Sequence, residues 1–221
     1  MRYDYLYVPL ICLSLLISTN ALSQGDPIKG KSLYGTCAAC HGQNAEGMLA
    51  TNSPSLSGMR DSYLIAQIQK FRTGLRGAKP GDVYGAQMVA MANVLPDEQA
   101  ILDVVAYIGT LKSVHIPRTE NDGDPVQGET LYFELECLGC HGRKGQGYKG
   151  TGDHGQRPVY DAPRLAGQHD WYLIRQLQNF KDGIRGYTGD KAGQDMRIQL
   201  FELDKIQMIK DLTAYIGTLE R

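Results

Sequence analysis

Cys37-Ala38-Ala39-Cys40-His41 is followed one hundred residues later by a second copy of the same pattern, Cys137-Leu138-Gly139-Cys140-His141. Cys-x-x-Cys-His is the attachment signature of c-type haem. Two thiols at this spacing add to the two vinyl groups of one porphyrin, and the adjacent histidine supplies an axial nitrogen to the iron. A lone Cys-x-x-Cys is more often a redox, disulfide or zinc pair. Two copies, each followed by glycine and each early in a similar half-chain, predict two covalently attached haem c groups.

The cysteine count supports this assignment. The chain has five cysteines, and the four outside the N-terminal segment are Cys37, Cys40, Cys137 and Cys140. No thiol is left for a structural disulfide, a zinc site or a nucleophile. Thioether bonds and iron ligation would therefore provide the crosslinks that disulfides usually provide in exported proteins.

Residues 1–23 have the pattern of a secretory signal peptide. Arg2 precedes a short apolar run over residues 8–17, and Ala21 and Ser23 offer small side chains for cleavage. The apolar run is too short to span a bilayer comfortably. An uncleaved anchor is the alternative. A lipoprotein modified at Cys12 is disfavoured because bulky Ile11 precedes it. We therefore expect an exported protein.

The charge balance excludes one class of partner. The formal net charge is -1, with 23 Lys and Arg residues against 24 Asp and Glu residues. The charges are spread evenly, so that neither half is a polycation or a polyanion. No basic stripe is available to meet phosphates, and nucleic-acid binding is therefore disfavoured.

An internal repeat organises the mature chain. The pattern Tyr-Leu-Ile-x-Gln-x-Gln-x-Phe, followed by Gly-x-Arg-Gly, occurs at residues 63–77 and again 109 residues later, at 172–186. Leu64, Ile68 and Phe71 share one helical face, which predicts an amphipathic helix over 61–72. Segments 97–112 and 204–219 carry the same pattern, Ala-Tyr-Ile-Gly-Thr-Leu, at 106–111 and 214–219, and each predicts a last helix in its half. Repetition at a constant offset indicates two copies of one structural unit.

The start of each half repeats as well. Asp-Pro opens a predicted helix at residues 26–27 and again at 124–125, with the aspartate as N-cap and the proline in the first turn. Gly30 and Gly128 each precede a tyrosine by four residues. A glycine inside a helix costs about 1 kcal/mol relative to alanine. We therefore expect these glycines to mark a close helix–helix crossing.

These elements predict an all-α protein with two tandem domains, each a small helical fold around one haem. The first domain is expected over 24–116 and the second over 125–221. Residues 117–124 contain a proline and several acidic residues, a composition typical of a linker.

Methionines in the glycine-rich loop that we expect before each last helix are the candidates for the sixth iron ligand. Met88 stands seven residues before Leu95, and Met196 stands seven residues before Leu203. Methionine opposite histidine raises the reduction potential of a haem, whereas an open site favours ligand binding or catalysis. The repeat therefore selects Met88 and Met196.

Other ligands stay open on the sequence alone. Met91 is near Met88 but aligns with Gln199, and Met208 falls on the apolar side of the last predicted helix. Met48 and Met59 are expected to fill gaps, as flexible thioethers usually do. Ligation by a second histidine, His154, is the remaining alternative.

Pro54 and Pro163 occupy matching places in a Pro-x-Leu-x-Gly pattern. A proline fixes the chain and leaves its carbonyl oxygen free to accept a hydrogen bond. That oxygen could receive the second ring N–H of His41 or His141 and so orient the imidazole. Equally, these could be ordinary loop prolines.

Taken together, residues 24–221 resemble the dihaem cytochrome c4 family, in which two class I cytochrome c domains are fused. The resemblance rests on both Cys-x-x-Cys-His-Gly motifs, the segment 165–169 (Leu-Ala-Gly-Gln-His), the Tyr/Gln/Phe helix, the methionines and the terminal Ala-Tyr helices. It implies His41–Met88 and His141–Met196 ligation and carbonyl partners for the histidines. It also implies a periplasmic, sometimes membrane-associated, electron carrier with its haems near the domain interface.

One departure from this pattern lies in the second half. From His141 to Pro163 the chain runs 22 residues, against 13 from His41 to Pro54, so that about nine residues are added within 143–162. The added residues leave two features of the second haem unpredicted: how exposed its edge is, and which surface a partner would dock on.

We therefore expect an electron carrier of a respiratory chain, not an enzyme. Its partners would be a redox donor and a terminal oxidase or other acceptor, with no small-molecule substrate. The alternative is the haem subunit of an oxidoreductase complex such as flavocytochrome c sulfide dehydrogenase. A dihaem enzyme is disfavoured, because thiosulfate dehydrogenases use a cysteine ligand and none is spare, while a peroxidase needs an open or displaceable site.

Overall fold

The computed structural model describes residues 24–114, 116, 119, 122–150 and 160–219. The predicted signal peptide (1–23), Cys12 and His154 lie outside these residues. Within the described ranges the structure is helical, with isolated bridges but no extended strand. The elements are α1 (Pro27–His41), η1 (Leu49–Thr51), α2 (Asp61–Arg72), α3 (Val83–Ala92), α4 (Glu98–Thr110), α5 (Pro125–Glu134), α6 (Cys137–His141), α7 (Asp170–Lys181), α8 (Lys191–Gln199) and α9 (Ile206–Ile216).

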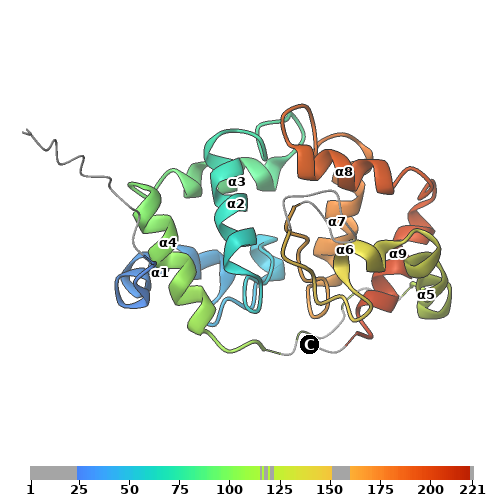
Figure 1. The fold of residues 1–221 in the computed structure, drawn as a ribbon, viewed down its shortest axis with the longest axis horizontal. Helices are drawn as coiled ribbons and strands as arrows, with labels where there is room; N and C mark the ends of the chain where they lie inside the picture. The colour runs from blue at the N-terminus through green and yellow to red at the C-terminus, as the bar shows by residue number, and fades with distance from the viewer. Residues whose placement is uncertain (1–23, 115, 117–118, 120–121, 151–159, 220–221) are drawn as a thin grey trace, which may run out of the picture.

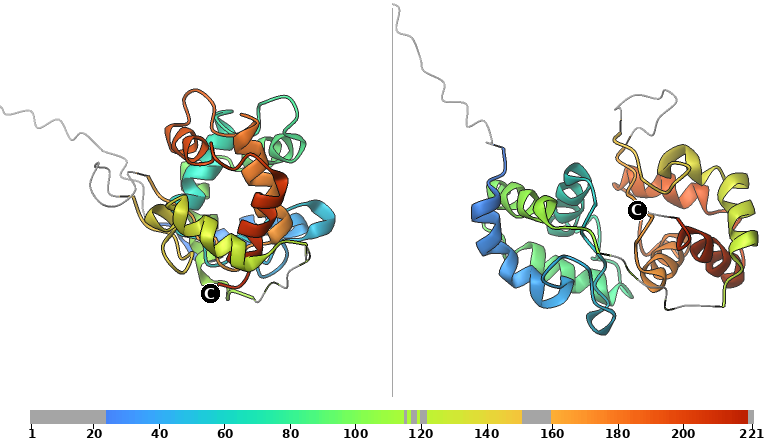
Figure 2. Two further views of the ribbon diagram at one scale, coloured as in Figure 1. Left: turned by 90° about the vertical axis from the view of Figure 1, so that its right-hand side faces the viewer. Right: turned by 90° about the horizontal axis from the view of Figure 1, so that it is seen from below.

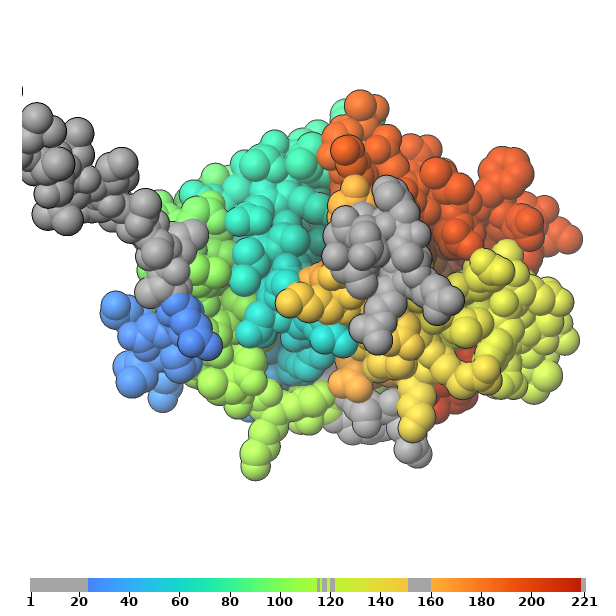
Figure 3. Space-filling view, viewed as in Figure 1, coloured from blue at the N-terminus to red at the C-terminus, as the bar shows by residue number. Residues whose placement is uncertain are grey.

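The helices form two domains that lie side by side along the long axis of the molecule (Figures 1 and 2). Helices α1, α2 and α4 contribute to one hydrophobic core, and helices α5–α9 contribute to another. The space-filling view shows the two domains in contact across the middle of the molecule (Figure 3). The prediction of an all-α protein with two tandem domains is confirmed.

In each domain the first helix crosses the last at a glycine. A Cβ atom on Gly30 would lie 1.9 Å from the carbonyl oxygen of Asp103 in α4, and a Cβ on Gly128 would lie 1.9 Å from that of Asp211 in α9. Any side chain at these positions would push the helices apart. The expected close crossing is therefore present in both domains.

The same aspartates fasten the start of each first helix. The Asp103 carboxylate accepts a hydrogen bond of 2.8 Å from the backbone N–H of Asp26, which caps α1. Asp211 does the same for Asp124, the cap of α5, also at 2.8 Å. A side chain on one helix thus satisfies a backbone donor at the start of the other.

The two domains differ where the first helix meets the haem motif. In the first domain α1 runs without a break through the motif to His41. In the second, α5 ends at Glu134 and a separate helix, α6, carries the motif. The chain has two more residues there, since three steps separate Tyr34 from Cys37 and five separate Tyr132 from Cys137. Glu136 takes up the excess in a left-handed conformation, with φ of 52°.

The predicted methionine-bearing loops are partly helical, which corrects the sequence-based expectation. Met88 lies in α3 and Met196 lies in α8. Both helices are capped by a buried aspartate: Asp82 accepts from the Gly85 N–H at 2.9 Å, and Asp190 accepts from the Gly193 N–H at 3.0 Å. These helices are short and their apolar periodicity is weak, so the glycines suggested a loop.

The Gly-x-Arg-Gly pattern sets the position of these short helices. Gly77 has φ of 84° and Gly186 has φ of 72°, a region that L-amino acids with side chains rarely adopt. A Cβ on Gly77 would lie 2.4 Å from the carbonyl oxygen of Gly85, and one on Gly186 would lie 2.2 Å from that of Gly193. The turn therefore packs directly against the first turn of α3 or α8.

Candidate functional site: two haem sites at the domain interface

A cavity of about 540 Å³ lies between the domains, is lined by residues of both, and has a mostly apolar surface. All eight predicted site residues line it: Cys37, Cys40, His41 and Met88 from the first domain, and Cys137, Cys140, His141 and Met196 from the second. Residues that are far apart in sequence, such as His41 and Met88, thus line the same shared cavity.

Each motif histidine is held by a proline carbonyl. His41 Nδ1 lies 2.8 Å from the carbonyl oxygen of Pro54, and His141 Nδ1 lies 2.9 Å from that of Pro163. A carbonyl only accepts, so Nδ1 carries the proton and donates it. The lone pair of the neutral ring is then on Nε2, the atom left for iron. Of the two roles open to these prolines, the structure shows the carbonyl-acceptor role.

Burial keeps both imidazoles neutral. His41 and His141 are each 5 % exposed. Burial lowers the pKa of both rings below the ordinary value, and the hydrogen bond to the proline carbonyl only partly opposes this. A neutral imidazole is the form that ligates a metal.

A tyrosine closes the turn after each histidine. Tyr34 donates from its hydroxyl to the carbonyl oxygen of Gly42 at 2.7 Å, and Tyr132 donates to that of Gly142 at 2.6 Å. Burial raises the pKa of both hydroxyls well above the usual range, so they remain protonated donors. The tyrosine seen in the repeat thus fixes the end of the haem motif.

The motif cysteines do not have the character of a redox pair. Burial raises the pKa of Cys37, and it raises the pKa of Cys137 to about 11. Reactive thiols are instead found where neighbouring positive charge lowers the pKa. Their setting against an apolar cavity suits thioether bonds to a porphyrin.

The structure also places the competing methionines. Met59 and Met91 line the cavity beside Met88, whereas Met208 packs against the core of the second domain and Met48 is 37 % exposed. Position 199, the repeat equivalent of Met91, is a glutamine whose side-chain amide donates to the Leu135 carbonyl at 3.1 Å. Among the described residues, Met88 and Met196 are therefore the only two methionines that occupy equivalent positions of the repeat and both line the cavity.

The residues present fit a haem in each domain. Two thiols at the attachment spacing, a buried imidazole with Nε2 available and a thioether all face a cavity with mostly apolar walls. Cys37, Cys40 and His41 would hold one haem, with the equivalent residues of α6 holding the other. Bound haem iron supplies a one-electron Fe(III)/Fe(II) couple.

Sequence reasoning missed the polar residues that line the same cavity from α2, α7 and the turns after them. The Gly-x-Arg-Gly repeat was visible, but its arginines, Arg76 and Arg185, were not singled out. Both are buried between the domains, with exposures of 7 % and 8 %. Their recurrence at one position of the repeat was the signal that could have identified them.

Comparison with known proteins places this architecture in a family. Residues 28–112 and 125–220 each match the family model for cytochrome c. Cytochrome c4 of Azotobacter vinelandii is 32 % identical over 193 residues, covering 81 % of this chain and 84 % of that protein. The chain belongs to the dihaem cytochrome c4 family. Members of the cytochrome c4 family carry electrons and are not enzymes, so this chain is a dihaem electron-transfer protein with two covalently bound haem c groups.

The fold of this cytochrome c4 family member agrees with the assignment. The crystal structure of reduced cytochrome c4 from Pseudomonas stutzeri superposes with a TM-score of 0.65 at 28 % identity, covering 89 % of this chain and all of that one. A further relative is the thiosulfate dehydrogenase electron acceptor of Stutzerimonas stutzeri, 30 % identical over 196 residues, covering 83 % of this chain and 80 % of that protein. None of the helices in the described residues is long and apolar enough to cross a membrane.

Proposed function

We propose that this protein is a periplasmic carrier of a respiratory chain in which both irons have histidine–methionine ligation. His41 and Met88 would be the axial ligands of the first haem, and His141 and Met196 those of the second. Cys37, Cys40, Cys137 and Cys140 would form the thioether bonds. The domains would extend over 24–116 and 125–221.

The observation that carries this proposal is the repeated arrangement at the cavity. Each domain presents one buried, correctly oriented imidazole and one repeat-equivalent methionine to the same space. Two axial ligands from the protein would make each iron six-coordinate. A six-coordinate iron has no open axial position and changes its oxidation state without binding substrate. Electron transfer then requires only donor and acceptor proteins.

The N-terminal sequence supports the proposed location. Residues 1–23 have the order of a secretory signal, with a basic residue, an apolar run and a small-residue site. We propose export to the periplasm, where a redox donor and a terminal oxidase or other acceptor would meet the carrier. Peripheral association with the membrane would bring it near such an oxidase.

The test is fractionation followed by a redox titration. We expect the haem-containing protein in the periplasmic fraction, with an N-terminus near residue 24 by mass spectrometry. We expect two one-electron steps, and no change in the haem spectrum when carbon monoxide is added to the reduced protein. Carbon monoxide binding at either iron would indicate an open or displaceable sixth position and would contradict the proposed ligation.

A second candidate function is supported by one of the relatives. The likeness to a thiosulfate dehydrogenase electron acceptor favours a carrier that serves an oxidoreductase directly, as expected for the haem subunit of such a complex. Flavocytochrome c sulfide dehydrogenase is another assembly of this kind. Co-purification of a stable dehydrogenase partner in fixed stoichiometry would favour this function over that of a free respiratory carrier.

A further inference from the structure

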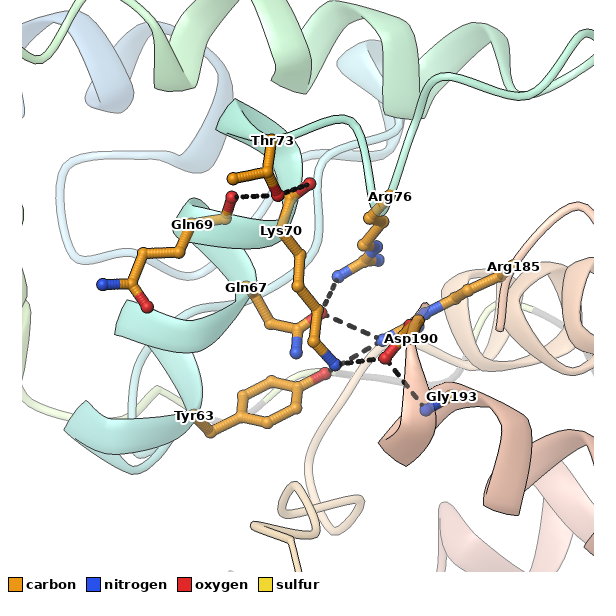
Figure 4. A network of polar contacts seen from close by, with 9 residues as sticks. All are labelled: Tyr63, Gln67, Gln69, Lys70, Thr73, Arg76, Arg185, Asp190 and Gly193. Carbon is orange, nitrogen blue, oxygen red and sulfur yellow. Dashed lines mark hydrogen bonds and ion pairs between the residues drawn. The ribbon is translucent and has the colours of Figure 1, made fainter. Parts of the chain in front are cut away.

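Gln168 joins the second domain to the loop that holds His41 in the first. This contact is separate from the polar network of Figure 4, in which Arg185 donates to Gln67 at 3.3 Å. The Oε1 of Gln168 accepts from the Ser55 N–H at 3.0 Å, and its Nε2 donates to the Ser55 carbonyl oxygen at 2.9 Å. Because a backbone N–H only donates and a carbonyl oxygen only accepts, this pair of bonds allows one orientation of the amide.

The Ser55 N–H belongs to the same peptide unit as the carbonyl that holds the first motif histidine. At one end of this unit, His41 Nδ1 donates to the Pro54 carbonyl oxygen at 2.8 Å. At the other end, the Ser55 N–H donates to Gln168. The two ends are conjugated through the partial double bond of the peptide. Hydrogen bonds therefore run in series from the imidazole, through one peptide, to an amide of the other domain.

Burial strengthens the bonds of this series. The exposed fractions are 5 % for His41, 1 % for Ser55 and 7 % for Gln168. Hydrogen bonds are electrostatically stronger in such a low-dielectric environment, and bonds in a chain polarise one another. Acceptance of the Ser55 N–H by Gln168 draws electron density toward the Pro54 oxygen. That oxygen becomes a better acceptor for the proton on His41.

Contacts within the first domain fix the path of the loop independently of Gln168. The N–H groups of Leu56 and Ser57 donate to the Ala45 carbonyl oxygen at 2.8 Å and 3.1 Å. The peptide also packs directly on Gly47, where a Cβ atom would lie 2.6 Å from the Ser55 nitrogen. We therefore expect loss of Gln168 to change the strength of the imidazole hydrogen bond more than the path of the loop.

The second domain has the same loop without this series. His141 Nδ1 donates to the Pro163 carbonyl oxygen at 2.9 Å, and the N–H of that peptide belongs to Arg164. Within the described part of the chain, no group accepts a hydrogen bond from the Arg164 N–H. The repeat equivalent of Gln168, at the offset of 109, is Met59, which carries no amide. The contact therefore distinguishes the two haem sites.

We propose that Gln168 is a positioning residue that lowers the reduction potential of the first haem by polarising the Pro54–Ser55 peptide and strengthening the hydrogen bond of His41. This inference rests on the proposed ligation of iron by His41. A stronger acceptor at Nδ1 makes the imidazole a more basic ligand. A more basic ligand favours Fe(III) over Fe(II), so that the potential falls. The docking of the domains thus acts through Gln168 on the first haem and not on the second.

The experiment compares the redox titration of Gln168→Met with that of Tyr187→Phe. Gln168→Met keeps a side chain of similar length, the one found at position 59, but removes the amide. Tyr187→Phe is the matched control, because it removes another uncharged bond between the domains, from the Tyr187 hydroxyl to the Gly74 carbonyl oxygen. Tyr187 does not line the cavity.

We expect a rise in potential at one haem only. In Gln168→Met, the Fe(II)/Fe(III) ratio of the first haem at a fixed ambient potential should rise about threefold, or about 28 mV at about 59 mV per tenfold change. The potential of the second haem should stay unchanged. Tyr187→Phe should leave both potentials unchanged. Nuclear magnetic resonance during the titration assigns each potential to its domain.

The proton signal of His41 Nδ1–H in the reduced protein is the second readout, because it reports the strength of the hydrogen bond itself. We expect it to move upfield in Gln168→Met, as a weaker hydrogen bond requires, while the signal of His141 stays in place. A merely structural role of Gln168 in domain docking would leave both signals where they are.

Haem content, the methionine–iron absorption band and carbon monoxide binding are recorded first for the wild type, so that failure of the proposed ligation is seen independently of Gln168. With ligation intact, an unchanged first potential and an unchanged His41 signal in Gln168→Met would overturn the proposal. Equal shifts of both potentials, or the same shift in Tyr187→Phe, would also overturn it, because a general loosening of the interface would then explain the effect. If Gln168→Met does not retain haem, Gln168→Asn, whose amide is one methylene shorter, decides by the same readouts.

Discussion

Lys70 of the first domain donates to Asp190 of the second at 2.6 Å, which links α2 directly to the start of the helix that carries Met196. The position equivalent to Lys70 in the second domain is Asn179, so the ion pair has no symmetric counterpart. Asp190 is 3 % exposed and Lys70 is 20 % exposed. The pair therefore distinguishes two domains that are otherwise built alike.

Lys70→Gln should weaken the docking of the domains. The substitution leaves the Asp190 carboxylate buried without its cation, although it still caps α8 through the Gly193 N–H. Breaking a fully buried pair costs about 3–5 kcal/mol, and partial exposure of Lys70 reduces this to about 2 kcal/mol in the free energy of unfolding. Denaturant unfolding followed by circular dichroism measures it.

Lys29→Gln is the control for that measurement. Lys29 is 71 % exposed and lies 4.0 Å from Asp26. An exposed pair of this kind contributes at most about 0.5–1 kcal/mol. Equal losses of stability in the two variants would show that the interdomain ion pair has no special role.

The helix crossing in the first domain gives a second prediction. Alanine substitutions at two glycines of α1 should change the free energy of unfolding in opposite directions. Gly30→Ala would place a Cβ 1.9 Å from the Asp103 carbonyl oxygen, whereas Gly35→Ala would meet nothing within 4 Å. We expect Gly30→Ala to lower the free energy of unfolding by about 3 kcal/mol, because the overpacked helices must separate. Gly35→Ala should raise it by about 0.5–1 kcal/mol through helix propensity.

Thermal and denaturant unfolding of the two variants tests this. Stabilisation by Gly30→Ala would mean that α1 and α4 are not in close contact. Gly128→Ala should repeat the loss in the second domain, where the Cβ would lie 1.9 Å from the Asp211 carbonyl oxygen.

Asp103 gives a prediction for the dependence of stability on pH. The hydrogen bond from the Asp26 N–H is the main cause that lowers the pKa of this carboxyl, and Gln99 adds to it. With a folded pKa below the unfolded value of about 3.9, the unfolded chain binds the proton first as the pH falls. The contribution of Asp103 is therefore full above about pH 5 and is lost as the pH falls through the folded pKa.

Asp103→Asn removes this ionisation but keeps an oxygen that can accept the hydrogen bond. The variant should be less stable than wild type at pH 7, with the difference shrinking below about pH 4. Melting temperatures measured from pH 3 to pH 7 report it. Parallel curves for the two proteins would contradict the role given to Asp103.

The parts of the fold that the sequence predicted are those in which one local pattern has one structural outcome. The amphipathic segment 61–72 is α2 (Asp61–Arg72), and the Asp-Pro pairs open α1 and α5. The predicted last helices 97–112 and 204–219 are shorter in the structure, as Glu98–Thr110 and Ile206–Ile216. Helix ends depend on capping and on packing with neighbours, which periodicity does not report.

Features that depend on tertiary context were missed. The short helices around Met88 and Met196 begin at buried aspartate caps and pack against glycine turns. Neither the caps nor the turns produce a periodic apolar pattern in the sequence. The break between α5 and α6 arises from two extra residues beside an otherwise repeated helix. The burial of Arg76 and Arg185 between the domains depends on how one domain faces the other, which an internal repeat does not report.

The central claim, that each iron is closed by one histidine and one methionine, is tested most directly by the weak near-infrared absorption band of methionine-bound ferric haem. In the purified oxidised protein we predict a band that Met88→Ala and Met196→Ala each reduce by about half and that the double variant lacks. Met91→Ala, at a neighbouring cavity position, should leave it intact. A full band in both Met88→Ala and Met196→Ala, with both haems retained, would contradict the ligand assignment.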